Sequence, residues 1–154
     1  MCIIFKPNML KKLTLEKFKE VYALVPRLTI EVIVKTPEGI ILSKRSIDPY
    51  KGFWHIPGGT VFLEEKLEDA VIRVAGDEIG LEVGITKFLG FIYYPEEKKY
   101  GGVGWTVGAA FQAFVEGGKL GGNEDGKEVG VFKKLPEKVI DVQAEFLKKH
   151  GLFE

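Results

Sequence analysis

Apolar residues recur along the chain in two spacings, and each spacing predicts one kind of secondary structure. Short runs rich in β-branched and aromatic residues, bounded by turns, predict strands over 28–35, 40–45, 53–59, 82–94, 104–116 and 129–135. Helical spacing predicts helices over 14–24, within 58–81 and over 141–149. Strands mixed with helices predict an α/β fold, an α/β/α sandwich around a central mixed β-sheet. The length suits one domain over residues 1–154.

The first predicted helix has its apolar residues on one side. Thr14 can cap its N-terminus, and Pro26 ends it. The apolar side consists of Leu15, Phe18, Val21 and Tyr22. A lid over the core and a contact between two copies of the chain explain this side equally well.

The stretch over 58–81 (GGTVFLEEKLEDAVIRVAGDEIGL) combines a glycine turn, a short loop and an amphipathic helix. Its apolar stripe consists of Leu67, Ala70, Val71, Val74 and Ala75. Asp77 and Glu78 are adjacent carboxylates that can bind a hard divalent cation through oxygen. Arg73 follows Glu65 by about two helical turns, so this pair can tie the loop to the helix.

Composition narrows the class of protein. The formal net charge is +0, so there is no electrostatic reason to expect nucleic acid or an anionic membrane as partner. A single cysteine, Cys2, excludes an internal disulfide and argues against a cysteine-based zinc site. No apolar run is long enough to span a membrane, and the N-terminal apolar patch is too short for a signal peptide. We therefore expect a soluble cytoplasmic protein.

Several polar residues outside the 58–81 stretch have both a bland and a functional interpretation. Lys44 and Arg45 are either a solvated basic pair or part of a diphosphate-binding site, because a guanidinium can bind a diphosphate through two parallel hydrogen bonds. His55 is interpreted first as a packed or hydrogen-bonded histidine, and His150 as a surface residue at a helix C-terminus. Four aromatic residues also have two interpretations, since they either pack in the core or at its rim or stack on a base or sugar: Tyr93, Tyr94, Tyr100 and Trp105.

Two polar loops are also predicted. Residues 95–102 read as a charged hairpin loop, and residues 117–130, rich in glycine, read as a mobile loop. The second loop holds the acids Glu124, Asp125 and Glu128.

The 58–81 stretch resembles the Nudix box, Gly-x5-Glu-x7-Arg-Glu-U-x-Glu-Glu-x-Gly-U, in which U is aliphatic. The positions that match outright are Gly59, Glu65, Arg73, Glu78, Gly80 and Leu81. Asp77 replaces a glutamate conservatively, whereas Val74 and Ala75 replace the glutamate and aliphatic residue after the arginine. Segments 26–34, 44–45 and 49–59 resemble the GDP-mannose mannosyl hydrolase branch, whose box also lacks that glutamate.

This resemblance implies a metal site for Mg²⁺ or Mn²⁺. Carried onto this chain, it makes the Gly58 carbonyl, Glu78 and Glu128 metal ligands, with Asp77 an outer or variable ligand. It also implies a small-molecule nucleotide substrate and a homodimer.

The resemblance further implies how the substrate is held. Arg45 would contact the diphosphate beside Lys44, and Glu31, where the branch has an aspartate, would contact the nucleotide or sugar. Gly59, Glu65 and Arg73 would be structural parts of the box.

The branch carries a catalytic histidine in the loop before the last strand, and this loop has none. The base would then be Glu124, Asp125 or Glu128, or be absent. Thr60 also stands where the branch has an arginine.

Three functions follow as hypotheses. The first is Mg²⁺-dependent hydrolysis of a nucleotide sugar such as GDP-mannose, releasing nucleoside diphosphate and sugar. The second is attack at phosphorus on a nucleoside triphosphate or dinucleoside diphosphate. The third is nucleotide binding with degraded catalysis.

Overall fold

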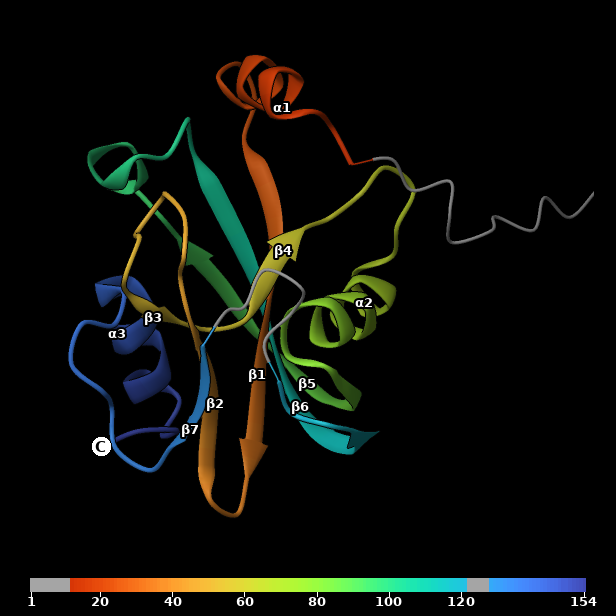
Figure 1. Cartoon of the computed structure of the whole chain (residues 1–154), viewed down its shortest axis with the longest axis vertical. Coiled ribbons are helices and arrows are strands. Elements are labelled where there is room, and N and C mark those ends of the chain that lie inside the picture. Colours follow the sequence, from red (N-terminus) through yellow and green to blue (C-terminus); the bar gives the residue numbers. More distant parts are fainter. Residues whose placement is uncertain (1–11, 122–127) are drawn as a thin grey trace, which may run out of the picture.

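The computed structural model describes residues 12–121 and 128–154, which form a mixed sheet between helices (Figure 1). The elements in chain order are α1 (Leu15–Tyr22), β1 (Arg27–Thr36), β2 (Gly39–Lys44), β3 (Trp54–His55), β4 (Gly58–Thr60), α2 (Leu67–Ile79), β5 (Leu81–Tyr93), the 3-10 helix η2 (Glu97–Tyr100), β6 (Thr106–Gly118), β7 (Val129–Phe132) and α3 (Asp141–Lys149). No helix in these two ranges is long and apolar enough to cross a membrane.

Strand β1 is the centre of the sheet. The order is β3-β2-β1-β6-β5, with β4 paired to β1 and β7 paired to β2. β1 runs parallel to β6 and antiparallel to β2 and β4, so the sheet is mixed as predicted. Helices α2 and α3 cover opposite faces of the sheet (Figure 1), which confirms the predicted α/β/α sandwich.

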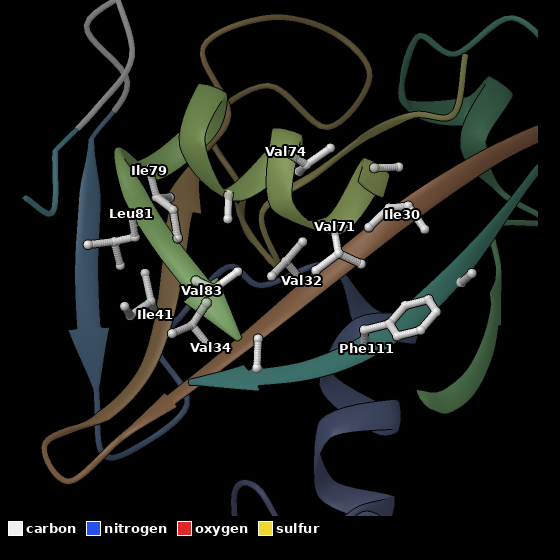
Figure 2. Close-up of a cluster of buried hydrophobic side chains, with 14 residues drawn as sticks. Ile30, Val32, Val34, Ile41, Val71, Val74, Ile79, Leu81, Val83 and Phe111 are labelled. Atoms are coloured by element: carbon white, nitrogen blue, oxygen red, sulfur yellow. The ribbon is translucent and has the colours of Figure 1, made fainter. Parts of the chain in front are cut away.

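Two cores follow from the alternation of side chains along β1. Ile30, Val32 and Val34 point to the α2 face, where they pack against the apolar stripe of that helix (Figure 2). Ile33 belongs to the second core, on the α3 face, together with Ile56 and Leu147. Because both faces are covered, the six consecutive β1 residues 29–34 are buried, and four of them are apolar. Glu31 is the acid within that run.

The structure corrects three sequence predictions. The single strand predicted over 53–59 is two short strands, β3 and β4, because the first pairs with β2 and the second with β1. The strand predicted over 129–135 ends at Phe132. The charged loop over 95–102 contains η2, and Glu97 within it is buried at 5% exposure.

Candidate active site

A cavity of about 680 Å³ opens between α1, the N-terminal half of β1, β4 and the segments 45–50 and 101–106. α1 has no buried residue, and its apolar side borders this cavity through Leu15, Phe18 and Tyr22. The helix therefore borders the cavity and is not a lid over the core, while the alternative, a contact between two copies of the chain, stays a prediction. Trp105 also lines the cavity and is 46% exposed.

Glu31 lines the cavity and lies between two glycines. Gly58 is its partner on β4, and a Cβ atom added there would lie 2.7 Å from Oε2 of Glu31. A Cβ atom at Gly108 on β6 would lie 2.7 Å from Oε1. Any side chain at either position would collide with the carboxylate, so both glycines leave the room that Glu31 occupies.

Burial raises the pKa of Glu31 from its ordinary value of 4.5 to about 7, although hydrogen bonds from Tyr94 and Thr29 partly oppose that rise. Both donors reach the same atom, Oε1, at 3.0 Å and 3.1 Å. At neutral pH this carboxyl group is therefore divided between its charged and neutral forms.

Arg45 brings positive charge to the same part of the cavity. It is half-buried and donates a hydrogen bond to the Pro49 carbonyl. Burial and the neighbouring Arg27 lower its pKa, while the carboxylates of Glu31 and Glu78 raise it. Glu78 of the box helix and Glu31 of β1 therefore both lie within electrostatic reach of one guanidinium.

Arg27, the second guanidinium at the cavity, is held by protein groups. It donates to Glu97 at 3.1 Å and to the hydroxyls of Thr60 and Thr106 at 3.2 Å. Thr106 in turn donates to Glu97 at 2.7 Å. This network explains the burial of Glu97, and it ties η2 to β1, β4 and β6.

The predicted pair within the box is formed. Arg73 donates to both carboxylate oxygens of Glu65, at 2.7 Å and 2.9 Å, and to the Thr60 carbonyl at 2.9 Å. Its guanidinium also lies 3.9 Å from the centroid of the Phe62 ring. The loop that links β4 to α2 is thus fastened to the helix by a bidentate ion pair.

Glu65→Gln should lower the free energy of unfolding by about 1–3 kcal/mol, because it removes the charge from a buried, doubly hydrogen-bonded pair. Urea denaturation at pH 7 measures this. The matched control is Glu96→Gln, which removes a carboxylate 3.8 Å from Lys99 in an exposed pair and should cost less than about 0.5 kcal/mol.

The difference between Glu65→Gln and the parent should also depend on pH. Burial raises the pKa of Glu65, but the hydrogen bonds from Arg73 and Phe62 outweigh it, so the net shift is downward. A lowered pKa stabilises the fold above the ordinary value of 4.5, and this contribution is lost as pH falls further. Equal stabilities at pH 7 would contradict this role for the pair.

The predicted metal ligands lie in different surroundings. Glu78 is half-buried beside Arg45, and Gly58 lines the cavity. The Asp77 side chain is 57% exposed and lies 3.7 Å from Arg73. The Glu128 side chain is 64% exposed and lies 3.8 Å from Lys44. In the described ranges, no three His, Cys, Asp or Glu side chains gather closely enough to hold a metal ion.

These positions are compatible with Mg²⁺, which commonly takes one or two protein carboxylates and completes its shell with water and substrate phosphates. Glu78 supplies such a carboxylate, and the Gly58 carbonyl a neutral oxygen. Gly58 also lines the cavity, next to the Glu31 carboxylate. The donor set is therefore of the right chemical kind for a hard cation.

Val74, which stands where the box has a glutamate, belongs to the α2 core (Figure 2). It is 1% exposed, and a Cβ atom at Gly59 would lie 3.1 Å from its Cγ2 atom. This position packs the helix against β4 and presents no polar group.

The other polar candidates take structural positions. His55 is buried, with Nε2 2.9 Å from the Ser43 hydroxyl, and His150 lies 2.9 Å from the Phe146 carbonyl through Nδ1. The Lys44 ammonium lies 5.8 Å from the Trp54 ring centroid. Glu124 and Asp125 lie outside the described residues.

Sequence reasoning missed the polar role of Gln143 on α3. This residue is 2% exposed, accepts from the Ile56 backbone N–H and donates to the Tyr94 hydroxyl, both at 2.7 Å. Its spacing from Leu147, one helical turn later, was the available signal for burial. Its partners come from distant parts of the chain and leave no such signal.

Comparison with known proteins identifies the family of this chain. A model of the NUDIX domain matches residues 25–147. ADP-ribose pyrophosphatase of Methanocaldococcus jannaschii is 32% identical over 139 residues, which are 89% of this chain and 79% of that protein. The low-salt glycan biosynthesis protein Agl8 of Haloferax volcanii is 37% identical over 75 residues, which are 49% of this chain and 48% of that protein, about half of each.

The fold is also similar to that of a solved structure. The crystal structure of a MutT NUDIX hydrolase from Burkholderia pseudomallei is similar with a TM-score of 0.72 at 24% identity, covering 80% of this chain and 97% of that one. The domain match spans most of the chain, and the similarity to a pyrophosphatase extends over nearly all of it. The chain therefore belongs to the Nudix family and is a Nudix hydrolase.

Proposed function

We propose that this Nudix hydrolase acts on a nucleoside diphosphate sugar such as GDP-mannose and, with Mg²⁺, releases nucleoside diphosphate and free sugar. The observation that carries the proposal is the meeting of Arg45, Glu31 and Gly58 in one cavity, with Glu78 within electrostatic reach of Arg45. A volume of about 680 Å³ lies within the range of small-molecule sites.

Each residue has a separate task in this proposal. The Arg45 guanidinium binds the diphosphate, and its partial burial strengthens that attraction. Mg²⁺, held by Glu78 and the Gly58 carbonyl, would neutralise charge on the diphosphate. Glu31 accepts a hydrogen bond from the sugar side through Oε2, because its two donors occupy Oε1.

We place the attack at the sugar carbon. Water adds to the anomeric carbon, the bond from that carbon to the diphosphate oxygen breaks, and the diphosphate leaves with the electron pair. The water proton passes to a base, for which Glu128 and the loop acids Glu124 and Asp125 are the candidates. Attack at the sugar carbon is supported by Val74, because the box position directly after Arg73 holds no carboxylate.

A second candidate is cleavage between the two phosphates. The similarity to an ADP-ribose pyrophosphatase over 89% of the chain favours it. The products would then be a nucleoside monophosphate and a sugar phosphate. On a nucleotide sugar, the two candidates differ only in the bond that breaks.

A substrate panel with product identification tests the proposal. GDP-mannose, UDP-glucose, ADP-ribose and nucleoside triphosphates are incubated with Mg²⁺, and the products are separated by ion-exchange chromatography. We expect a nucleoside diphosphate and free sugar from at least one nucleotide sugar. Turnover of triphosphates alone would overturn the proposed substrate class, and binding without turnover would indicate a nucleotide-binding module. We also expect a cytoplasmic homodimer, whose mass light scattering measures.

A further inference from the structure

A series of buried hydrogen bonds runs from the segment before Gly58, through α3, to Glu31. The Ile56 N–H donates to Oε1 of Gln143 at 2.7 Å, and Nε2 of Gln143 donates to the Tyr94 hydroxyl at 2.7 Å. That hydroxyl donates to Oε1 of Glu31 at 3.0 Å. The exposed fractions of these four residues are all 5% or less.

The first member of the series determines the direction of all the others. A backbone N–H can only donate, so the oxygen of the Gln143 amide faces Ile56 and its nitrogen faces Tyr94. An amide nitrogen also only donates, so the Tyr94 hydroxyl must accept there. Its single proton is then directed to Glu31.

The position of Gln143 in this series is held by the backbone. The Ile140 N–H, at the start of α3, donates to the Trp54 carbonyl at 3.2 Å, and the Trp54 N–H donates to the Lys138 carbonyl at 2.9 Å. These two bonds attach the helix start to β3, two residues before Ile56. Gln143 therefore stays in register with the N–H that orients its amide.

The series also determines which oxygen of Glu31 is occupied by donors from the protein. The Thr29 hydroxyl donates to Oε1 at 3.1 Å, so Oε1 receives two donors. Oε2 lies toward Gly58. We propose that Gln143 is a positioning residue, which orients the Tyr94 hydroxyl and thereby presents Oε2 of Glu31 to the substrate; this rests on the function proposed above.

Three variants test the proposal. Gln143→Met keeps a similar side-chain volume and removes both hydrogen bonds. Gln143→Glu keeps an acceptor for the Ile56 N–H but makes a second carboxylate compete for the Tyr94 proton. Val142→Ala is the matched control, since it removes apolar contacts of the half-buried neighbouring residue on the same helix.

We expect Gln143→Met to lower kcat by about 10-fold or more with KM changed less than about twofold. In a Glu31→Gln background the same substitution should change kcat no further, because the residues act as one unit. An equal fall in kcat in both backgrounds would overturn the proposal. The proposal would also be overturned if Val142→Ala lowered kcat by the same factor at the same loss of melting temperature.

A neutron crystal structure of Gln143→Glu, which shows where the Tyr94 hydroxyl proton lies, gives an answer that does not depend on the substrate. The proposal expects the Tyr94 hydroxyl to turn from Glu31 toward residue 143. An unchanged Tyr94–Glu31 hydrogen bond would contradict the proposal even if the enzyme hydrolyses nucleotide sugars. Conversely, a turned hydroxyl in an enzyme that hydrolyses none of the panel would contradict only the proposed function.

Discussion

Glu78→Gln should reduce Mg²⁺-dependent hydrolysis by at least about 100-fold, because an amide oxygen carries no charge and binds a hard cation poorly. Glu78 is half-buried on the box helix, and its charge acts on Arg45. The substitution keeps the shape of the side chain, so the fold should be retained. Initial rates over a range of Mg²⁺ concentrations measure the effect.

A binding measurement separates metal loss from other causes. Calorimetry with Mn²⁺ should show weaker affinity for Glu78→Gln than for the parent protein. The matched control is Glu68→Gln, an exposed acid in the first turn of α2, which should leave rate and affinity unchanged. Full activity in Glu78→Gln would remove Glu78 from the metal site.

Glu31→Gln should make the protein more stable at pH 8 while lowering kcat/KM by about 10- to 100-fold. Burial raises the pKa of Glu31 from 4.5 to about 7. The folded state therefore holds this proton more tightly than the unfolded state, and the charged form opposes folding. A rise from 4.5 to about 7 corresponds to about 3 kcal/mol at full ionisation.

Because the pKa of Glu31 is raised, the stability difference between the parent protein and Glu31→Gln should depend on pH in a distinct way. Below pH 4.5 the carboxyl group is protonated in both states, so parent and variant should have similar stability. Between pH 4.5 and about 7 the unfolded state ionises first, and the parent loses stability relative to Glu31→Gln. Above about pH 7, Glu31→Gln should remain more stable than the parent protein by the full difference in free energy of unfolding. Urea denaturation in the presence of EDTA, from pH 4.5 to pH 8, measures it.

Glu97→Gln is the control for this experiment. Glu97 is as buried as Glu31, at 5% exposure, but it is paired with Arg27 at 3.1 Å. Removing its charge leaves a guanidinium without its carboxylate, so this variant should be less stable than the parent protein. A Glu31→Gln variant that is no more stable than the parent at pH 8 would show that Glu31 carries no raised pKa.

The local parts of the site could be predicted from the sequence. Glu65 and Arg73 stand at a spacing that brings them together through one loop and one helix, and the structure shows that pair. The apolar stripe of α2 likewise follows from helical periodicity, and all but Leu67 of its members are buried. These features depend on residues close together in the chain.

The convergence around Glu31 could not be predicted in this way. It depends on the pairing of β1 with β4 and with β6, and on the packing of α3 against the end of β5. The sequence shows an acid inside an apolar run. Its raised pKa, its two glycine neighbours and its link to Gln143 appear only when distant segments meet.

The position of Glu97 has the same explanation. The sequence predicted a charged hairpin loop here because four charged residues follow one another, Glu96, Glu97, Lys98 and Lys99. Glu97 is instead drawn inward by Arg27, which comes from β1 seventy residues earlier. Composition predicts a solvated segment on average, and it does not identify the member that finds a buried partner.

Hydrolysis of GDP-mannose in ¹⁸O-labelled water, with Mg²⁺ and mass spectrometry of both products, tests the central claim most directly. Attack at the sugar carbon places the label in the free sugar and leaves the nucleoside diphosphate unlabelled, which is the predicted result. Label in a phosphate group, whether of a nucleoside diphosphate or of a nucleoside monophosphate, would contradict attack at carbon and establish attack at phosphorus.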